Sequence, residues 1–268
     1  MLKDVTLGQY FPGTSFIHRL DPRTKLLATF VYIAALFVAK WFVSYAVVLA
    51  LLIVCIAVSG IRPSAFFRGL KPILFIILFT AVINLFATRG GTVLWHWWKL
   101  TITSAGVELA SLMVVRIMLL ITGTLLLTYT TTPMALTDGL ELLLDPIKKL
   151  GAPVHEFSMM MSIALRFIPT LIEEADKIAS AQKARGADFE TGSLIERAQA
   201  LLPLLVPLFV SAFRRADELA VAMESRCYHG GEGRTRMKKL SMRPADWATL
   251  AGSGIFLAGI IVLSRYGL

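Results

Sequence analysis

Two arginines, Arg185 and Arg226, each stand between small residues at a point where a long helical pattern stops. A guanidinium makes forked hydrogen bonds to carboxylates or to helix-end carbonyls, and small neighbours let a partner's backbone approach. A cation at a helix C-terminus also complements the helix macrodipole, so each arginine has a purely structural explanation as well. The recurrence favours docking tips that fit two equivalent grooves on a dimeric partner. The tripeptides are Ala184-Arg185-Gly186 and Ser225-Arg226-Cys227.

The chain lacks the sequence motifs of an enzyme. It has no G-x-x-x-x-G-K-[ST] phosphate loop, no nucleophile elbow and no paired-carboxylate motif. Its four histidines are scattered singly and have no metal-ligand spacing. We therefore expect no catalytic site, no cofactor and no bound metal.

Arg116 is a charged residue near the centre of an apolar run. A lone charge at that depth costs about 2.5–3.5 kcal/mol on insertion scales. It could bind a substrate or an anion, or it could face the bundle interior and bond to carbonyls or to Asn84. No carboxylate partner lies at a matching spacing, so the structural role is favoured.

Composition and charge indicate a membrane protein. The sequence of 268 residues is 56% hydrophobic, above the share usual in soluble domains. Residues 132–243 hold 15 of the 27 Lys/Arg and 14 of the 18 Asp/Glu, so the net charge of +9 comes mostly from the rest of the chain. A nucleic-acid binder would instead concentrate basic residues in its polar domain. Basic residues that flank membrane helices fit this distribution.

Five apolar segments predict an all-α integral membrane protein. The first is short and spans only if it extends through Val43. Basic residues cluster before the first segment and between the second and third. By the positive-inside rule the N-terminus and residues 132–243 are cytoplasmic and the C-terminus is external. The segments are Leu26 to Ala39, Ser44 to Ser59, Pro72 to Ala87, Ser104 to Thr131 and Trp247 to Leu263.

The outer loop between the third and fourth segments contains Trp95-His96-Trp97-Trp98. Tryptophans gather at membrane interfaces, so we interpret them as an aromatic belt in preference to a surface that stacks a ligand.

The polar block 132–243 is predicted to be helical throughout. Thr132-Pro133 and Asp145-Pro146 each resemble an N-cap followed by proline. Apolar residues recur every three and four positions from about His155 to Lys183, and a second helix should run from about Leu194 to Ser225.

The middle of that second helix, residues 201–213, is apolar all round. Thirteen such residues are too few to span a bilayer, so another surface must cover them. The residues expected to make this contact are Leu204, Leu205, Leu208 and Phe209.

The chain resembles the transmembrane T component of energy-coupling factor transporters, the EcfT or CbiQ-like family. The resemblance covers essentially the whole chain. The two arginine motifs, in this order and each ending a long helix, are its most specific part. The segments that carry it are Leu20–Lys25, Thr130–Pro133, Ala164–Pro169, Gln182–Gly186 and Ala222–Tyr228.

The resemblance implies a transmembrane scaffold in a prokaryotic cell membrane. It would couple two ATPase subunits to a small substrate-capture subunit that takes up a vitamin or a metal ion. Residues 1–131 would form a membrane bundle, 132–243 a cytoplasmic coupling domain, and 244–268 the last span. The tripeptide around Arg185 would dock one ATPase and that around Arg226 the other, although Cys227 replaces the family's glycine. The substrate-capture subunit would cover residues 201–213.

Two other functions are compatible with a hydrophobic chain. A secondary permease or channel acting alone would bind its solute without ATPase partners. An integral membrane enzyme would need a polar cluster that the sequence does not offer. Neither accounts for two matched arginine tips.

Overall fold

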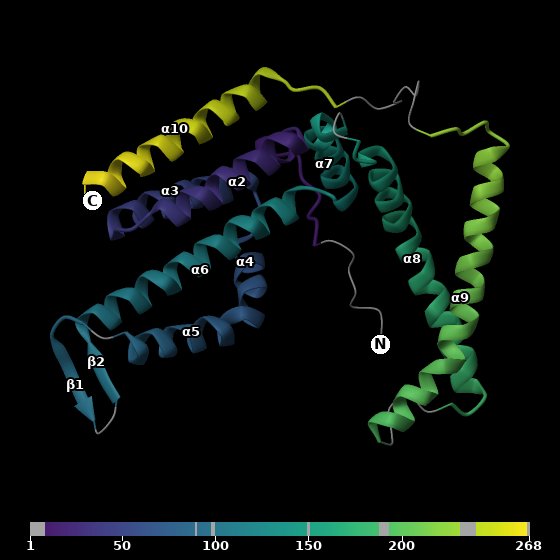
Figure 1. Cartoon of the computed structure of the whole chain (residues 1–268), viewed down its shortest axis with the longest axis horizontal. Helices are drawn as coiled ribbons and strands as arrows, with labels where there is room; N and C mark the ends of the chain where they lie inside the picture. The colour runs from purple at the N-terminus through teal and green to yellow at the C-terminus, as the bar shows by residue number, and fades with distance from the viewer. Residues whose placement is uncertain are drawn as a thin grey trace. The chain divides into compact units, whose positions relative to one another are not determined.

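The structure, a computed structural model, describes residues 9–88, 90–97, 100–148, 151–187, 193–230 and 240–266. Within these residues the chain forms two compact units, Leu143–Lys239 and Gly8–Leu142 with Leu240–Leu268. Helices make up almost all of both units, as predicted (Figure 1).

The larger unit is a bundle around α2 and α6. Helix α10 packs along α2, and α6 contacts α2, α3 and α5. Its elements are α1 (Phe16–Arg19), α2 (Pro22–Val38), α3 (Phe42–Ser59), α4 (Pro63–Leu70), the 3-10 turn η1 (Lys71–Ile73), α5 (Leu74–Ala87), β1 (Val93–Trp97), β2 (Leu100–Thr103), α6 (Ser104–Thr130), the first part of α7 (Pro133–Lys148) and α10 (Pro244–Tyr266).

Among the residues that the structure describes, five helical segments are long and apolar enough to cross a membrane: Phe42–Ser59, Pro63–Ala87, Ser104–Thr130, Gln199–Glu224 and Pro244–Tyr266. Four of them correspond to predicted spans. The first predicted span corresponds to α2, whose 17 residues extend roughly 26 Å, a little less than the hydrocarbon thickness. Gln199–Glu224 qualifies because the polar turns beyond the 13 apolar residues lengthen the helix.

The loop between α5 and α6 is more regular than predicted. Strands β1 and β2 pair antiparallel as a hairpin, with Trp95 opposite Ile102 and Trp97 opposite Leu100. β-branched residues and tryptophan favour paired strands, which explains why the segment is not an irregular loop. Trp98 and the side chains of Trp95, His96 and Trp97 lie outside the described residues, so the aromatic belt stays a prediction.

Arg116 holds the C-terminal end of α2. Its Nε donates to the hydroxyl of Tyr45 at 2.7 Å, and its Nη2 donates to the carbonyl of Ala39 at 3.1 Å. The Tyr45 hydroxyl donates to the same carbonyl, and Ser264 Oγ donates to that of Val38. The last carbonyls of a helix have no partner within the helix, and an unpaired one is costly in a membrane. The structure thus gives Arg116 the carbonyl partner of the structural interpretation.

The smaller unit consists of the end of α7 together with α8 (Val154–Ala184) and α9 (Leu194–Glu224), which pack against each other. Both long helices begin and end within two residues of the predicted positions. Thr132 caps α7 as predicted, because its hydroxyl accepts the N–H of Ala135 at 3.2 Å. The second predicted N-cap, Asp145, is wrong: α7 continues through Pro146 to Lys148.

Candidate functional site

The end of α8 is closed by a left-handed glycine. Arg185 is the C-cap residue, and Gly186 follows it with a φ of 90°. The N–H of Gly186 donates to the carbonyl of Lys183 at 3.0 Å. The N–H of Ala187 donates to the carbonyl of Gln182, also at 3.0 Å. These two bonds form a Schellman motif, which pairs carbonyls that the helix leaves free.

The end of α9 has the same geometry, although no glycine is present. Cys227 takes the left-handed position with a φ of 56°. Its N–H donates to the carbonyl of Glu224 at 2.8 Å, and the N–H of Tyr228 donates to that of Met223 at 3.0 Å. Arg226 therefore occupies the same cap position in α9 that Arg185 occupies in α8. The sequence suggested two similar helix ends, and the backbone bonds are equivalent.

Both tips project into open space. All six residues of the two tripeptides are exposed. The backbone N–H of each arginine bonds within its own helix end, but neither guanidinium has a hydrogen bond or an ion pair with any residue that the structure describes. Each guanidinium thus keeps its donors available for another molecule. We name these two tripeptides the arginine tips.

Replacing Cys227 by glycine is expected to stabilise the end of α9. A side chain in the left-handed region costs about 1–2 kcal/mol, partly offset by the freedom that glycine gains in the unfolded chain. We expect a net gain of about 0.5–1 kcal/mol, seen as slower hydrogen exchange in the last turn. Cys227→Ala is the matched control, because it removes the thiol but keeps the Cβ. Equal protection in the two variants would contradict the explanation.

A polar contact ties α8 to α9. Glu174 accepts a hydrogen bond from Ser211 Oγ and an ion-paired bond from Arg215 Nη2 at 2.8 Å. The bond from Ser211 and the pairing with Arg215 lower the pKa of Glu174 from its usual value, although burial opposes them. An apolar cavity of about 280 Å³ lies between the two helices and is lined by Phe167, Leu171 and residues of α9. The arginine tips are thus carried by paired helices.

One face of α9 exposes a continuous row of apolar side chains, which we name the apolar stripe. Of the predicted contact residues, Leu205 and Phe209 belong to it, whereas Leu204 and Leu208 are half-buried. Exposed apolar surface of this extent marks a contact with lipid or with a protein. Between 44% and 69% of each stripe residue is exposed: Leu201, Leu202, Leu205, Val206, Phe209, Val210 and Phe213.

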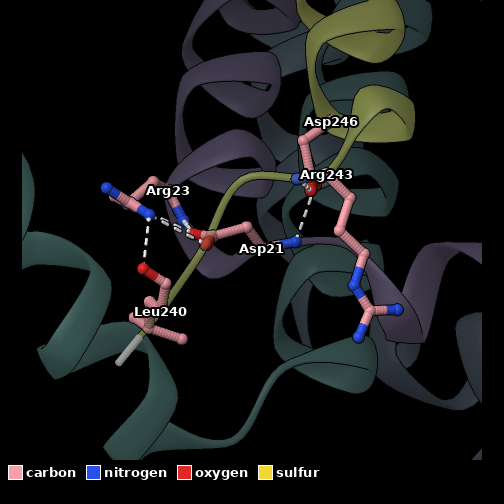
Figure 2. A network of polar contacts seen from close by, with 5 residues as sticks. All are labelled: Asp21, Arg23, Leu240, Arg243 and Asp246. Carbon is pink, nitrogen blue, oxygen red and sulfur yellow. Dashed lines mark hydrogen bonds and ion pairs between the residues drawn. The ribbon is translucent and has the colours of Figure 1, made fainter. Parts of the chain in front are cut away.

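A polar network joins the start of α2 to the start of α10 (Figure 2). The N–H groups of Asp21 and Arg243 each donate to one carboxylate oxygen of Asp246, both at 2.8 Å. Asp246 is 2% exposed. A buried carboxylate of this kind is stable only when its oxygens are paired. Asp246 therefore fixes the first turn of α10 to the first turn of α2.

Asp21 and Arg23 extend this network. The Asp21 carboxylate caps α2 by accepting the N–H of Arg23 at 2.9 Å, and it accepts Nε and Nη2 of the same arginine at 3.1 Å each. Arg23 Nη2 also donates to the carbonyl of Leu240 at 3.3 Å. Burial raises the pKa of Asp21, but the bonds and charge of Arg23 outweigh burial and leave it below its ordinary value. Asp21 is therefore ionised at neutral pH.

Sequence reasoning gave no role to this network. Asp21-Pro22 and Arg243-Pro244 with Asp246 do have the form of helix starts, which was the available signal. Nothing local indicates that Asp21 and Asp246 meet, because 225 positions separate them. Among the described residues, no group of three His, Cys, Asp or Glu side chains could hold a metal ion.

Comparisons with known proteins cover nearly the full chain. The sequence profile of the family described as "CbiQ: Cobalt transport protein" matches residues 13–237. The chain is 53% identical over 265 residues to the "Energy-coupling factor transporter transmembrane protein EcfT" of Thermosediminibacter oceani, covering 99% of each chain. It is 52% identical to the protein of that name from Clostridium kluyveri (99% and 98%) and 46% identical to that from Bacillus subtilis (99% and 100%).

Proposed function

The chain belongs to the CbiQ/EcfT family of transporter transmembrane proteins, and from that premise we propose that it couples two ATPase subunits to a substrate-capture subunit. In this proposal it neither hydrolyses ATP nor binds the solute. It transmits motion between the subunits that do, in the cell membrane of a prokaryote. The N-terminus and the unit that contains α8 and α9 face the cytoplasm, and the C-terminus faces outward.

The matched geometry of the arginine tips carries this proposal. Two helices of 31 residues each end in the same Schellman motif with an exposed arginine at the same cap position. If the two arginines served only to end their helices, neither guanidinium would need to be free of partners within the chain. Two equivalent tips fit two copies, or two homologous chains, of one kind of ATPase. Arg185 docks one of these subunits and Arg226 docks the other.

Co-purification of the ATPase subunits with charge-reversal variants of the tips tests the proposal. The chain is tagged, expressed with its native partners and extracted from the membrane. Recovery of both ATPases by the wild type and their loss from the Arg185→Glu, Arg226→Glu double variant would support it. Solute transport by the purified chain without ATPases would support the permease alternative.

The apolar stripe of α9 is proposed to contact the substrate-capture subunit. Crosslinkers placed at Leu205 or Phe209, both on the stripe, are expected to capture a small membrane protein in native membranes. A crosslinker at Arg214, which lies on α9 next to the stripe and is exposed, is the matched control. It should capture much less of that protein. Crosslinks from the stripe to lipid or to this chain alone would count against the contact.

A further inference from the structure

The segment Asp21-Pro22-Arg23-Thr24-Lys25, here the DPRTK segment, holds both stretches of chain that connect the two units. We propose that it is the junction through which motion of the unit Leu143–Lys239 enters the membrane bundle. This inference rests on the proposed function, because it assigns the path of the motion that the ATPases drive. Its residues act by holding other parts of the chain in place.

The outgoing connection is held by Lys25. Its Nζ donates to the carbonyl of Thr130 at 2.9 Å and to that of His18 at 3.2 Å. Thr130 is the last residue of α6, and α7 begins three residues later. Lys25 is only 6% exposed, and a buried ammonium keeps its charge only with partners of this kind. The end of α6 is therefore attached to the first turns of α2.

Close packing reinforces the outgoing side. Gly139 of α7 is buried against the DPRTK segment, where an added Cβ would lie 2.9 Å from Pro22 Cβ and 3.3 Å from Arg23 N. Both distances are shorter than an ordinary contact, and the second is to backbone. Helix α7, which leads into the other unit, thus lies directly on the start of α2.

The returning connection is held by Asp21 and Arg23. Leu240 is the first residue of the chain that belongs again to the bundle, and its carbonyl accepts Arg23 Nη2. Figure 2 shows the returning strand passing between Arg23 and Asp246, with Asp21 N–H directed at the Asp246 carboxylate. A displacement of the chain on either side of the unit Leu143–Lys239 therefore acts on the same DPRTK segment.

The far end of α2 indicates what happens to a force applied at its start. Helices α6 and α10, which carry the two connecting strands, are also bonded to the C-terminal carbonyls of α2 through Arg116 and Ser264. Because α2 is tied to both helices at both ends, the three helices move as one body. The junction then converts a displacement of the strands into a displacement of this three-helix body.

Hydrogen exchange of the complex with its ATPases, with and without ATP plus vanadate, tests the junction. In the wild type we expect the nucleotide to change exchange in α8 and α9 and also in α2 and α10. In Arg23→Ala and Lys25→Met the change in α8 and α9 should remain. The nucleotide-induced change in exchange in α2 and α10 should become smaller by about fivefold or more, because loss of coupling between two sites typically has an effect of at least that size.

Arg243→Ala is the matched control, because it removes an arginine from the same network but keeps the backbone N–H that Asp246 uses. Figure 2 shows the Arg243 guanidinium directed away from both carboxylates, and its side chain is exposed. This variant should respond as the wild type does. An undiminished response of α2 and α10 in both test variants would overturn the junction. Loss of the response in all four helices would also overturn it, since the segment would then serve assembly.

The same experiment separates this inference from the function on which it rests. If the wild type recovers no ATPase subunits, the proposed function fails. If it recovers them and responds to nucleotide, only the behaviour of the Arg23 and Lys25 variants decides the junction. Thermal unfolding of each variant complex shows whether it is folded.

Discussion

Charge reversal of both arginine tips, Arg185→Glu with Arg226→Glu, is expected to abolish recovery of the ATPase subunits and to leave the chain in the membrane. Both residues lie beyond the last turn of their helices and outside the predicted spans, so insertion does not depend on them. A docked arginine meets a carboxylate or a helix terminus away from water. Removing one partner of such a pair costs about 2–5 kcal/mol, much of it from the unpaired group left behind.

The size of this effect separates docking from helix capping. Since about 1.4 kcal/mol is a factor of ten, each lost tip weakens binding roughly thirty-fold to several-thousand-fold. A cation that only complements a helix dipole contributes about 0.3–1 kcal/mol, and neutral replacements would then leave the complex intact. Single alanine variants should therefore show a clear partial loss, and reversal to glutamate a larger one.

Arg214→Glu is the control for net charge. Arg214 lies on α9 and is exposed, and its side chain has no partner among the described residues, but it is not at the helix end. Its reversal should leave recovery near the wild-type level. Normal recovery of both ATPases with the double tip variant would show that Arg185 and Arg226 are ordinary helix caps.

The sequence predicted the features that depend on local patterns. Apolar residues at three- and four-residue spacing located α8, a second helix was predicted over nearly the same residues as α9, and the stop of each helical pattern placed Arg185 and Arg226 at helix ends. Thr132-Pro133, an N-cap residue followed by proline, likewise predicted the start of α7 from local sequence. The same kind of evidence failed at Asp145-Pro146. Proline favours the first turn of a helix, so the pair suggested a helix start, but α7 accommodates Pro146 in its last turn and continues to Lys148.

Features that depend on distant contacts could not be predicted. The backbone N–H of Asp21 donates to Asp246, and Lys25 donates to a carbonyl at the end of α6, so no short stretch of sequence contains either pair. The partner of Arg116 was predicted only by type, as a carbonyl or a polar group. The structure identifies it as the carbonyl of Ala39 and adds Tyr45, which accepts a hydrogen bond from Arg116 and whose ring centroid lies 5.7 Å from the guanidinium carbon above it. The equivalence of the two arginine tips could be recognised only from the backbone hydrogen bonds, because Cys227 does not resemble the glycine that usually ends a helix.

The packing of α2 on α6 leads to a second large effect, in the bundle that would receive the transmitted motion. Gly123 of α6 is buried, and an added Cβ would clash with the ring of Tyr32 on α2. The Tyr32 hydroxyl donates to the carbonyl of Leu119 at 2.9 Å, so the ring has a fixed place. Small residues of this kind let membrane helices approach closely.

Gly123→Leu is therefore expected to force α2 and α6 apart and to lower the free energy of unfolding by about 3 kcal/mol or more, at the upper end of overpacking. The measurement is the unfolding midpoint of the purified chain in detergent. Gly259→Leu is the matched control, because Gly259 is an exposed glycine of α10 with no atom within 4 Å of the added Cβ. It should change the midpoint little.

Removing the opposing ring tests the assigned cause. Tyr32→Ala alone should destabilise, since it loses ring packing and the bond to Leu119. Combined with Gly123→Leu it should restore part of the loss, because the leucine would occupy space that the ring has left. The two changes would then be less than additive, as expected for residues in direct contact. Strict additivity, or a Gly259→Leu variant as unstable as Gly123→Leu, would show that the α2–α6 contact is not what Gly123 protects.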